Sequence, residues 1–340
     1  MNVVPISTTK SSGIVATAAF LQPVRADLQA VEARMQAELG SDVRTISALS
    51  RHLLEAGGKR LRPAMVALAA RAVNPNADPT RVATVGAAME FVHMATLVHD
   101  DVVDNTAIRR GRPTANAVYG NGVAVLSGDY ILARSMRLLA LDGDLRIIRT
   151  VSEVTIDMSE GEVMEIVATG RIDLPIPEYF EILRKKTAVF VEGCCRCGAI
   201  LGGADETQEE ALAEYGFRIG MAFQIVDDLL DYVGDPAITG KPRGSDLRDG
   251  RATLPLLLAL EEIPAERKTM LLDAFGNPNL GEEAVDAVCN LLESAGAFEK
   301  TQTLAQAHVE CAKQSLALLP ETPSRASLEL LAAYIAERNY

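Results

Sequence analysis

The chain has 340 residues, of which 48% are hydrophobic and 23% are charged, and its formal net charge is −13. This composition is ordinary for a globular protein with a substantial core, and it excludes disorder of the whole chain. The acidic balance, with a pI near 4.9, argues against nucleic acid as a partner, because Lys and Arg contacts to phosphates supply most of that affinity.

The N-terminal residues 1–20 are predicted to be a flexible tail that precedes one helical domain over residues 21–340. The apolar stretch from Ile14 to Leu21 is short, has only Lys10 before it and lacks a convincing small-residue cleavage site, so no signal peptide is expected. No apolar run approaches the roughly 18 to 20 residues of a bilayer span. We therefore predict a cytoplasmic protein without a transmembrane segment, with peripheral membrane contact left open.

The hydrophobic pattern is helical along the whole chain. Alternating apolar and polar runs are scarce and aromatic residues make up only 4%, whereas Ala, Leu, Glu and Arg recur with helical periodicity. Breaks occur, in chain order, at residues 57–58, 74–79, 111–113, 120–122, 142–144, 170–177, 202–204, 234–250, 276–281 and 320–323. None of them is long and polar enough for an inter-domain linker, so we predict an all-α, single-domain fold.

The first functional signal in chain order is the basic turn Gly57-Gly58-Lys59-Arg60-Leu61-Arg62-Pro63. It places three cations beside a flexible turn, which suits a diphosphate that has no metal of its own. Further basic residues lie near the two acidic clusters described next, at Arg109, Arg110, Arg112, Lys185, Lys186, Lys241 and Arg243. Taken singly, each is more often a surface residue that aids solubility, but their repeated placement favours a common pocket.

Two copies of one acidic pattern are embedded in apolar sequence, at Asp100-Asp101-Val102-Val103-Asp104 and at Asp227-Asp228-Leu229-Leu230-Asp231. Positions four apart share a helix face, so the outer aspartates of each copy lie together, with His93 on the face of the first and Gln224 on that of the second. Asp is rarely buried unless it is paired or binds a cation. A single copy would more often be a solvated acidic face, but two copies in apolar helices predict magnesium bridged to a diphosphate.

Three of the five cysteines are close together, at Cys194, Cys195 and Cys197. Zinc sites need four well-spaced ligands, and no second pair follows the CxxC spacing of Cys194 and Cys197. We predict that these thiols are buried and act as small apolar residues.

These motifs, in this order, resemble those of the trans-type polyprenyl diphosphate synthases of the isoprenoid synthase family. The resemblance covers about residues 50 to 260 and rests on residues 90–110, residues 220–231 as far as Lys241, and Gly250-Arg251-Ala252-Thr253-Leu254-Pro255. It implies an all-α helical bundle with a large central cavity, active as a homodimer. The substrates would be an allylic diphosphate, such as farnesyl diphosphate, and isopentenyl diphosphate.

The same resemblance assigns roles to individual residues. About three magnesium ions would be held on the allylic diphosphate by Asp100, Asp104, Asp227 and Asp231, with Asp101 and Asp228 in support. The allylic diphosphate would also contact Arg109, Lys186 and Lys241, and isopentenyl diphosphate would bind Lys59, Arg62, His93 and Arg110. Thr187 and Gln224 would stabilise the allylic cation, and Arg251 stands where the family commonly has Lys.

The product is predicted to be a long all-trans chain, octaprenyl to decaprenyl, for a quinone side chain. In the family, side chains before the first aspartate motif set the product length; here the fifth and fourth residues before Asp100 are Ala95 and Thr96, which leave the tunnel open. Met136 is predicted to form its floor. The alternatives are a geranylgeranyl diphosphate synthase, a regulatory subunit of a heteromeric synthase, and a terpene cyclase.

Overall fold

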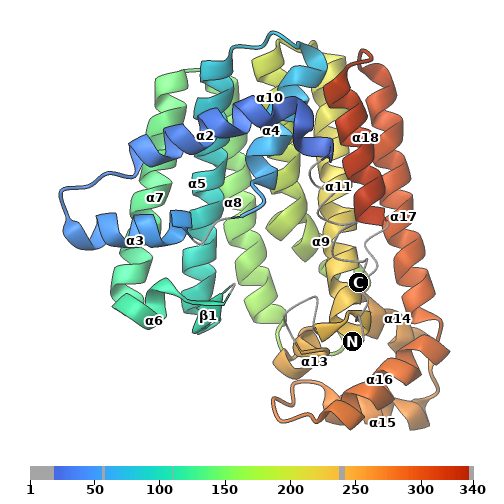
Figure 1. Ribbon diagram of the computed structural model, residues 1–340. Coiled ribbons are helices and arrows are strands. Elements are labelled where there is room, and N and C mark those ends of the chain that lie inside the picture. Colours follow the sequence, from blue (N-terminus) through green and yellow to red (C-terminus); the bar gives the residue numbers. More distant parts are fainter. Residues whose placement is uncertain (1–18, 56–57, 110, 237–241, 337–340) are drawn as a thin grey trace, which may run out of the picture. The chain divides into compact units, whose positions relative to one another are not determined.

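The computed structural model describes residues 19–55, 58–109, 111–236 and 242–336, which are almost wholly helical (Figure 1). Contacts divide the chain into two compact units. Unit 1 comprises Met1–Glu153, Gly193–Leu212 and Leu318–Leu328. Unit 2 comprises Val154–Glu192, Ala213–Ala317 and Glu329–Tyr340. The all-α prediction is confirmed over the described residues, whereas the single domain, the N-terminal tail and the large central cavity stay predictions.

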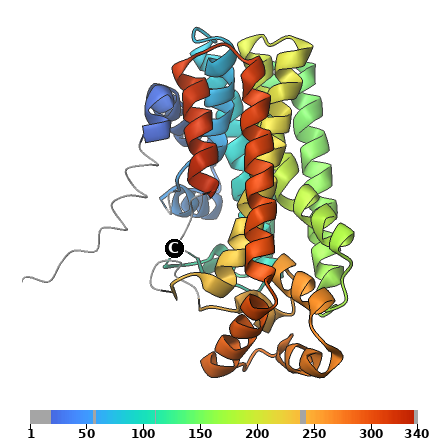
Figure 2. The same cartoon turned by 90° about the vertical axis from the view of Figure 1, so that its right-hand side faces the viewer.

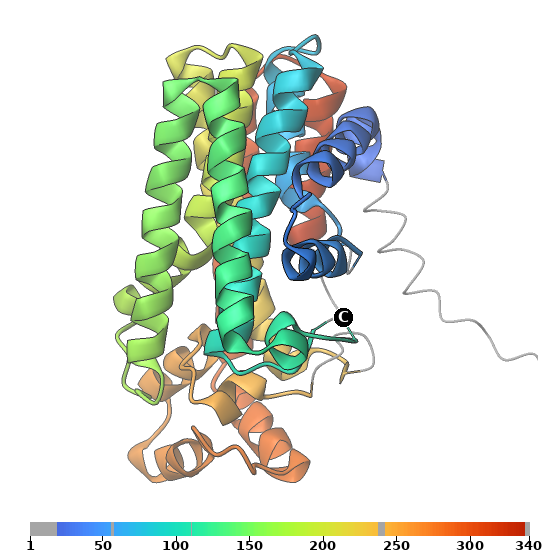
Figure 3. The ribbon, with the colours of Figure 1, turned by 90° about the vertical axis from the view of Figure 1, so that its left-hand side faces the viewer.

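Unit 1 is built around the helix α5. Its own elements are η1 (Gln22–Val24), α2 (Arg25–Glu38), α3 (Arg44–Glu55), α4 (Leu61–Val73), α5 (Pro79–Val103), β1 (Ile108–Arg109), β2 (Arg112–Pro113), α6 (Ala115–Tyr119) and α7 (Asn121–Asp142). The two short strands form an antiparallel hairpin. Helices α2, α4, α6 and α7 all pack against α5, and Figure 3 shows α7 running alongside it.

The ends of α5 follow from its sequence. The Asp78 side chain accepts a hydrogen bond of 2.8 Å from the Thr80 amide, and Pro79 occupies the first turn, where its missing N–H costs nothing. A Cβ on Gly86 would lie 2.9 Å from a Val31 methyl, so glycine lets α2 approach closely. The helix ends at Val103, inside the first acidic motif, and therefore carries that motif on its last turn.

Within the described part of the chain, α5 is the one helix that by length and composition alone is able to cross a membrane, which the sequence analysis did not expect. The structure buries 78% of its most apolar window. Because a membrane-spanning helix faces lipid whereas α5 is enclosed by other helices of its unit, we interpret α5 as a core helix.

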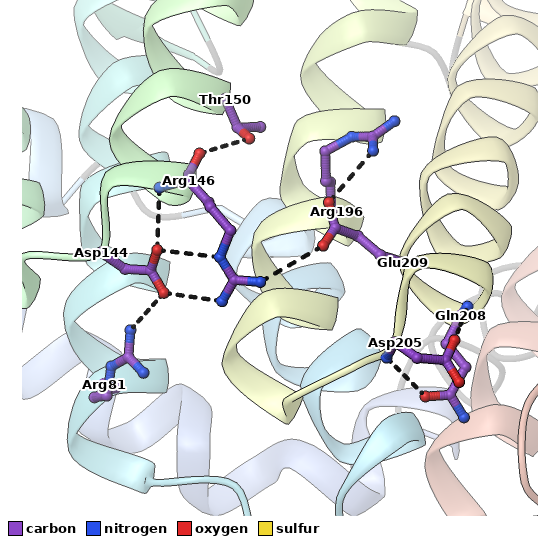
Figure 4. A network of polar contacts seen from close by, with 8 residues as sticks. All are labelled: Arg81, Asp144, Arg146, Thr150, Arg196, Asp205, Gln208 and Glu209. Carbon is purple, nitrogen blue, oxygen red and sulfur yellow. Dashed lines mark hydrogen bonds and ion pairs between the residues drawn. The ribbon is translucent and has the colours of Figure 1, made fainter.

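A network of charged side chains lies near the start of α5 (Figure 4). Arg81 forms an ion pair with Asp144 at 3.6 Å, and Arg146 bonds Asp144 at 3.2 Å and approaches Glu209 at 4.0 Å. Arg81 is 19 residues before Asp100 (100 − 81), which is about 28 Å along a helix. The network therefore cross-links helices of unit 1 far from the acidic motif, which indicates a structural role.

Unit 2 contains α9 (Ile176–Leu183), the π-helical η2 (Arg184–Ala188), α13 (Ser245–Asp249), α14 (Leu254–Glu262), α15 (Ala265–Ala274), α16 (Glu282–Ser294), α17 (Ala297–Ser315) and part of η3 (Leu316–Leu318). The boundaries between the units fall within α8 (Leu145–Ala168), α10 (Val189–Gly202), α11 (Glu206–Val233), η3 and α18 (Pro323–Ala336). Helix α14 packs against α9, α16 and α17, and α15 packs against α16 (Figure 2). Fully buried leucines at 254, 256, 271 and 292 contribute to this core.

Candidate active site

The first acidic motif lies at the C-terminal end of α5. Asp104 caps the helix, its amide donating to the Asp100 carbonyl at 2.8 Å, and its side chain is exposed while that of Asp100 is half-buried. Asp101 is different, because it is only 5% exposed and accepts a hydrogen bond of 2.7 Å from Arg109 Nε on strand β1. The outer aspartates are thus placed to bind a ligand, whereas Asp101 holds the guanidinium of Arg109 in a fixed orientation.

The second acidic motif lies near the C-terminal end of α11 and shows the same division. Asp227 is exposed, whereas Asp228 is 6% exposed. Asp231 is half-buried and accepts hydrogen bonds from the Ser245 hydroxyl at 2.8 Å and from the amides of Ser245 and Asp246 at 3.1 and 3.0 Å. Asp231 therefore also orders the start of α13, while carboxylate oxygens retain lone pairs for a metal.

A chain of hydrogen bonds runs from Asp228 to the residues expected to stabilise the allylic cation. The Tyr179 hydroxyl donates to Asp228 Oδ2 at 2.7 Å, and Gln224 Nε2 donates to Oδ1 at 2.9 Å. The Thr187 hydroxyl in turn donates to Gln224 Oε1 at 3.1 Å. Thr187 and Gln224, which the family resemblance assigns to the allylic cation, therefore lie in contact, and Asp228, bound by Tyr179, holds the Gln224 amide.

Burial is the main influence on the charge of Asp228. It raises the pKa of Asp228 to about 7, against the hydrogen bonds from Gln224 and Tyr179, which lower it, and the charge of Asp227 raises it further. Both hydrogen-bond donors are neutral. A cation near this motif would favour the ionised carboxylate.

Lys186 lies in the π-helical turn η2 and is bound by carboxylates of α8. Its ammonium forms an ion pair with Glu162 at 3.0 Å and contacts Glu165. Burial opposes the charge, but Glu165 and Glu162 outweigh it and raise the pKa of Lys186, so the side chain is an ammonium at neutral pH. A diphosphate bound by Lys186 would have to compete with these carboxylates.

Two glycines let η2 pack tightly in unit 2. A Cβ on Gly161 of α8 would lie 2.8 Å from the Lys186 amide nitrogen, and one on Gly220 of α11 would lie 2.6 Å from the Ala188 Cα. Any side chain at either position would push this turn away. Single π-helical turns occur frequently at functional sites, and here one carries both Lys186 and Thr187.

The residues expected to bind isopentenyl diphosphate lie in unit 1. Lys59 is exposed, Arg62 is half-buried in the first turn of α4, and His93 is half-buried on α5. A cavity of about 60 Å³ is lined by His93 together with Asp101 of the first motif and Arg109 of β1. The predicted ligands Arg110 and Lys241 lie outside the described residues, and Arg251 forms an ion pair with Asp246 at 3.9 Å.

The residues predicted to set product length lie on the packed pair α5 and α7. Ala95 is fully buried, Thr96 is half-buried and donates to the His93 carbonyl at 2.9 Å, and Met136 is half-buried. Their role in product length stays a prediction.

The three clustered cysteines are fully buried, as predicted, and none of them is in a disulfide bond. Burial raises the pKa of the Cys197 thiol to about 12, so this thiol is protonated at neutral pH.

Among the described residues, no group of three or more His, Cys, Asp or Glu side chains is placed to hold a metal. Magnesium is usually held by one or two carboxylates together with substrate phosphate oxygens. The outer aspartates of each motif fit this donor set, because they are hard oxygen ligands paired on one helix face. Magnesium binding stays a prediction.

Three residues that contact predicted site residues were not assigned from the sequence: Tyr179, which binds Asp228, and Glu162 and Glu165, which bind Lys186. The two glutamates had a signal, because they continue an acidic row on α8 that also includes Asp157 and Glu160, which bind Lys185 at 2.5 and 2.6 Å. Tyr179 had none, since it is 49 residues from its partner.

The chain is similar to known proteins over most of its length. The family model described as polyprenyl synthetase matches residues 43–292. The octaprenyl diphosphate synthase of Escherichia coli K12 is 37% identical over 313 residues, covering 92% of this chain and 96% of that protein.

Two solved structures are similar over nearly their whole length. A decaprenyl diphosphate synthase from Rhodobacter capsulatus has a TM-score of 0.89 and 36% identity, with 95% of this chain and 99% of that one covered. A polyprenyl synthase from Caulobacter crescentus CB15, complexed with calcium and isoprenyl diphosphate, has a TM-score of 0.88 and 36% identity, with 95% and 98% covered.

Proposed function

The chain belongs to the polyprenyl synthetase family, and on that premise we propose that it condenses an allylic diphosphate with successive isopentenyl diphosphates to an all-trans octaprenyl to decaprenyl diphosphate. The observation that carries the proposal is the shared arrangement of the two aspartate motifs. In each, the outer aspartates are more accessible than the buried inner one, which protein donors hold. This arrangement suits ligands for a metal and diphosphate on one face of each helix.

The chain's own residues supply binding and orientation. Asp100 and Asp104 would hold magnesium in unit 1, as would Asp227 and Asp231 in unit 2, and the bound ions would neutralise charge on the departing diphosphate. Arg109, fixed by Asp101, would bind that diphosphate, as would Lys186.

Once the allylic carbon–oxygen bond breaks, the positive charge on carbon needs fixed dipoles in a site that excludes water. The Thr187 hydroxyl and the Gln224 amide, which are hydrogen-bonded to each other, would supply these fixed dipoles. The alkene of isopentenyl diphosphate then attacks the cation and a proton is lost. We assign no protein base, and the departing diphosphate is the expected acceptor.

The proposal of a long product depends on the small side chain of Ala95, which precedes the first motif. Ala95 lies about 7.5 Å below Asp100 along α5, at 1.5 Å per residue. Each buried methylene contributes about 0.8 kcal/mol, so an apolar chain is retained while space remains. The names of the octaprenyl and decaprenyl relatives support this range, and a quinone side chain is the proposed use of the product.

A homodimer is the proposed assembly. Helix α8 carries large apolar side chains that are exposed in unit 2, at Ile156, Val163, Ile166 and Val167. Their spacing places them on one side of the helix, where a second copy would cover them. We also propose a cytoplasmic location for the protein and about three magnesium ions in each active site.

The proposal is tested by incubating the purified chain with magnesium, farnesyl diphosphate and excess isopentenyl diphosphate, and sizing the products by mass spectrometry. Products of eight to ten isoprene units are expected. A stop at geranylgeranyl diphosphate would contradict the open tunnel at Ala95. Absence of condensation would refute the synthase and favour a regulatory subunit or, if farnesyl diphosphate alone were consumed, a cyclase.

A further inference from the structure

Arg60 has an unusual backbone conformation. Its φ of 49° and ψ of 40° place it in the left-handed region, and Asn105 is the other non-glycine residue with positive φ among those described. Left-handed backbone is unfavourable for a long side chain and persists only where the surroundings impose it. Arg60 lies directly before α4, so its conformation sets the direction in which the chain at Lys59 leaves that helix.

The Arg60 side chain is held by carboxylates from two other helices. Its Nε donates to Glu32 of α2 at 2.5 Å and its Nη1 donates to Glu90 of α5 at 2.9 Å. The side chains of Arg60 and Glu90 are only 10% and 5% exposed. Of the three cations in the basic turn, Arg60 is therefore committed to an internal ion pair, whereas Lys59 is exposed.

The ion pair also connects the basic turn to the helix that carries His93. Glu90 and His93 are three residues apart on α5 and so lie on the same face. Arg60, Glu90 and His93 line the same cavity of about 60 Å³. Arg62, in the first turn of α4, follows Arg60 by two residues.

We propose that Arg60 is a positioning residue that holds Lys59 and Arg62 in register with His93 for the diphosphate of isopentenyl diphosphate. Its left-handed backbone orients the turn, and its ion pairs with Glu90 and Glu32 anchor the turn to α5 and α2. The inference rests on the proposed function, because that function assigns Lys59, Arg62 and His93 to this substrate.

The test is Glu90→Gln, which keeps the size of the side chain and removes the charge that anchors Arg60. Initial rates are measured with each substrate varied in turn. The KM for isopentenyl diphosphate should rise about tenfold, since a charge-assisted buried contact is lost, while kcat and the KM for farnesyl diphosphate stay within about twofold. Arg60→Lys, which cannot bind both carboxylates as a fork, should show the same pattern.

Arg81→Lys is the matched control, because it weakens the ion pair of another arginine, which lies at the far end of α5. It should lower the melting temperature without separating the two KM values. If Glu90→Gln and Arg60→Lys resembled this control, or changed kcat and both KM values together, the positioning role would be wrong.

Calorimetric binding of isopentenyl diphosphate alone separates this inference from the proposed function. If the wild-type chain binds this substrate but does not condense it, the proposed function fails, and a loss of affinity in Glu90→Gln of about tenfold still supports the positioning role. Unchanged affinity in Glu90→Gln, or no binding to the wild-type chain, overturns the inference.

Discussion

Replacing Tyr179 by Phe should impair catalysis with only a modest loss of stability. The change removes one hydroxyl, whose hydrogen bond of 2.7 Å to Asp228 is buried on both sides, with Tyr179 3% exposed. A buried hydrogen bond to a carboxylate contributes about 1.5–3 kcal/mol. Asp228 would keep its bond from Gln224 but gain freedom to rotate, which would disturb the amide that accepts from Thr187. Loss of such a supporting contact typically lowers activity about 10- to 100-fold.

The effect is measured by single-turnover condensation of farnesyl and isopentenyl diphosphates, together with the melting temperature. Tyr232→Phe is a suitable control. Tyr232, on α11, is buried like Tyr179, but its hydroxyl accepts a longer and weaker hydrogen bond of 3.3 Å from Thr253. The rate constant should fall in Tyr179→Phe and stay near wild type in Tyr232→Phe. Equal rates in wild type and Tyr179→Phe would refute the argument that Asp228 positions Gln224.

Three further predictions concern the acidic motifs and the tunnel. Asp100→Ala or Asp227→Ala should lower turnover by orders of magnitude with unchanged circular dichroism, and near-wild-type rates at saturating magnesium would remove the metal assignment. Burial raises the pKa of Asp228 to about 7, whereas its pKa in the unfolded chain is near 4, so the folded state binds more protons than the unfolded state between these pH values. The free energy of unfolding should therefore fall as the pH rises from about 4 to 7. Urea titrations of Asp228→Asn should show a smaller fall over the same range. Met136→Ala should lengthen the products seen by mass spectrometry, and an unchanged length would show that Met136 does not form the tunnel floor.

Much of the site could be predicted from the spacing of residues along the sequence. The rule that residues four apart share a helix face correctly joined Gln224 to Asp228, and the apolar setting of both motifs correctly placed them on helices. The same rule placed the outer aspartates of each motif together, but it gave no reason to expect the inner ones to be buried, because burial depends on packing against other elements.

The features that escaped prediction all depend on contacts distant in sequence. The basic turn places three cations close together and gives no sign of an internal partner for Arg60, yet Arg60 forms ion pairs with carboxylates 28 and 30 residues away. The π-helical turn at Arg184–Ala188 packs against Gly161 and Gly220, and nothing in the local sequence distinguishes it from an ordinary helix. Helical propensity describes a segment by itself, whereas these conformations are imposed by neighbouring helices.

The two acidic motifs share a pattern but not an electrostatic environment. In the first, the buried Asp101 is bound by the guanidinium of Arg109, which supplies a positive charge within 2.7 Å. In the second, Tyr179 and Gln224 donate neutral hydrogen bonds to the buried Asp228, whose pKa is raised to about 7. Because a nearby cation favours an ionised carboxylate, metal bound by Asp227 would supply to Asp228 the positive charge that Arg109 already supplies to Asp101. The second motif should therefore depend more strongly on bound metal for its organisation than the first.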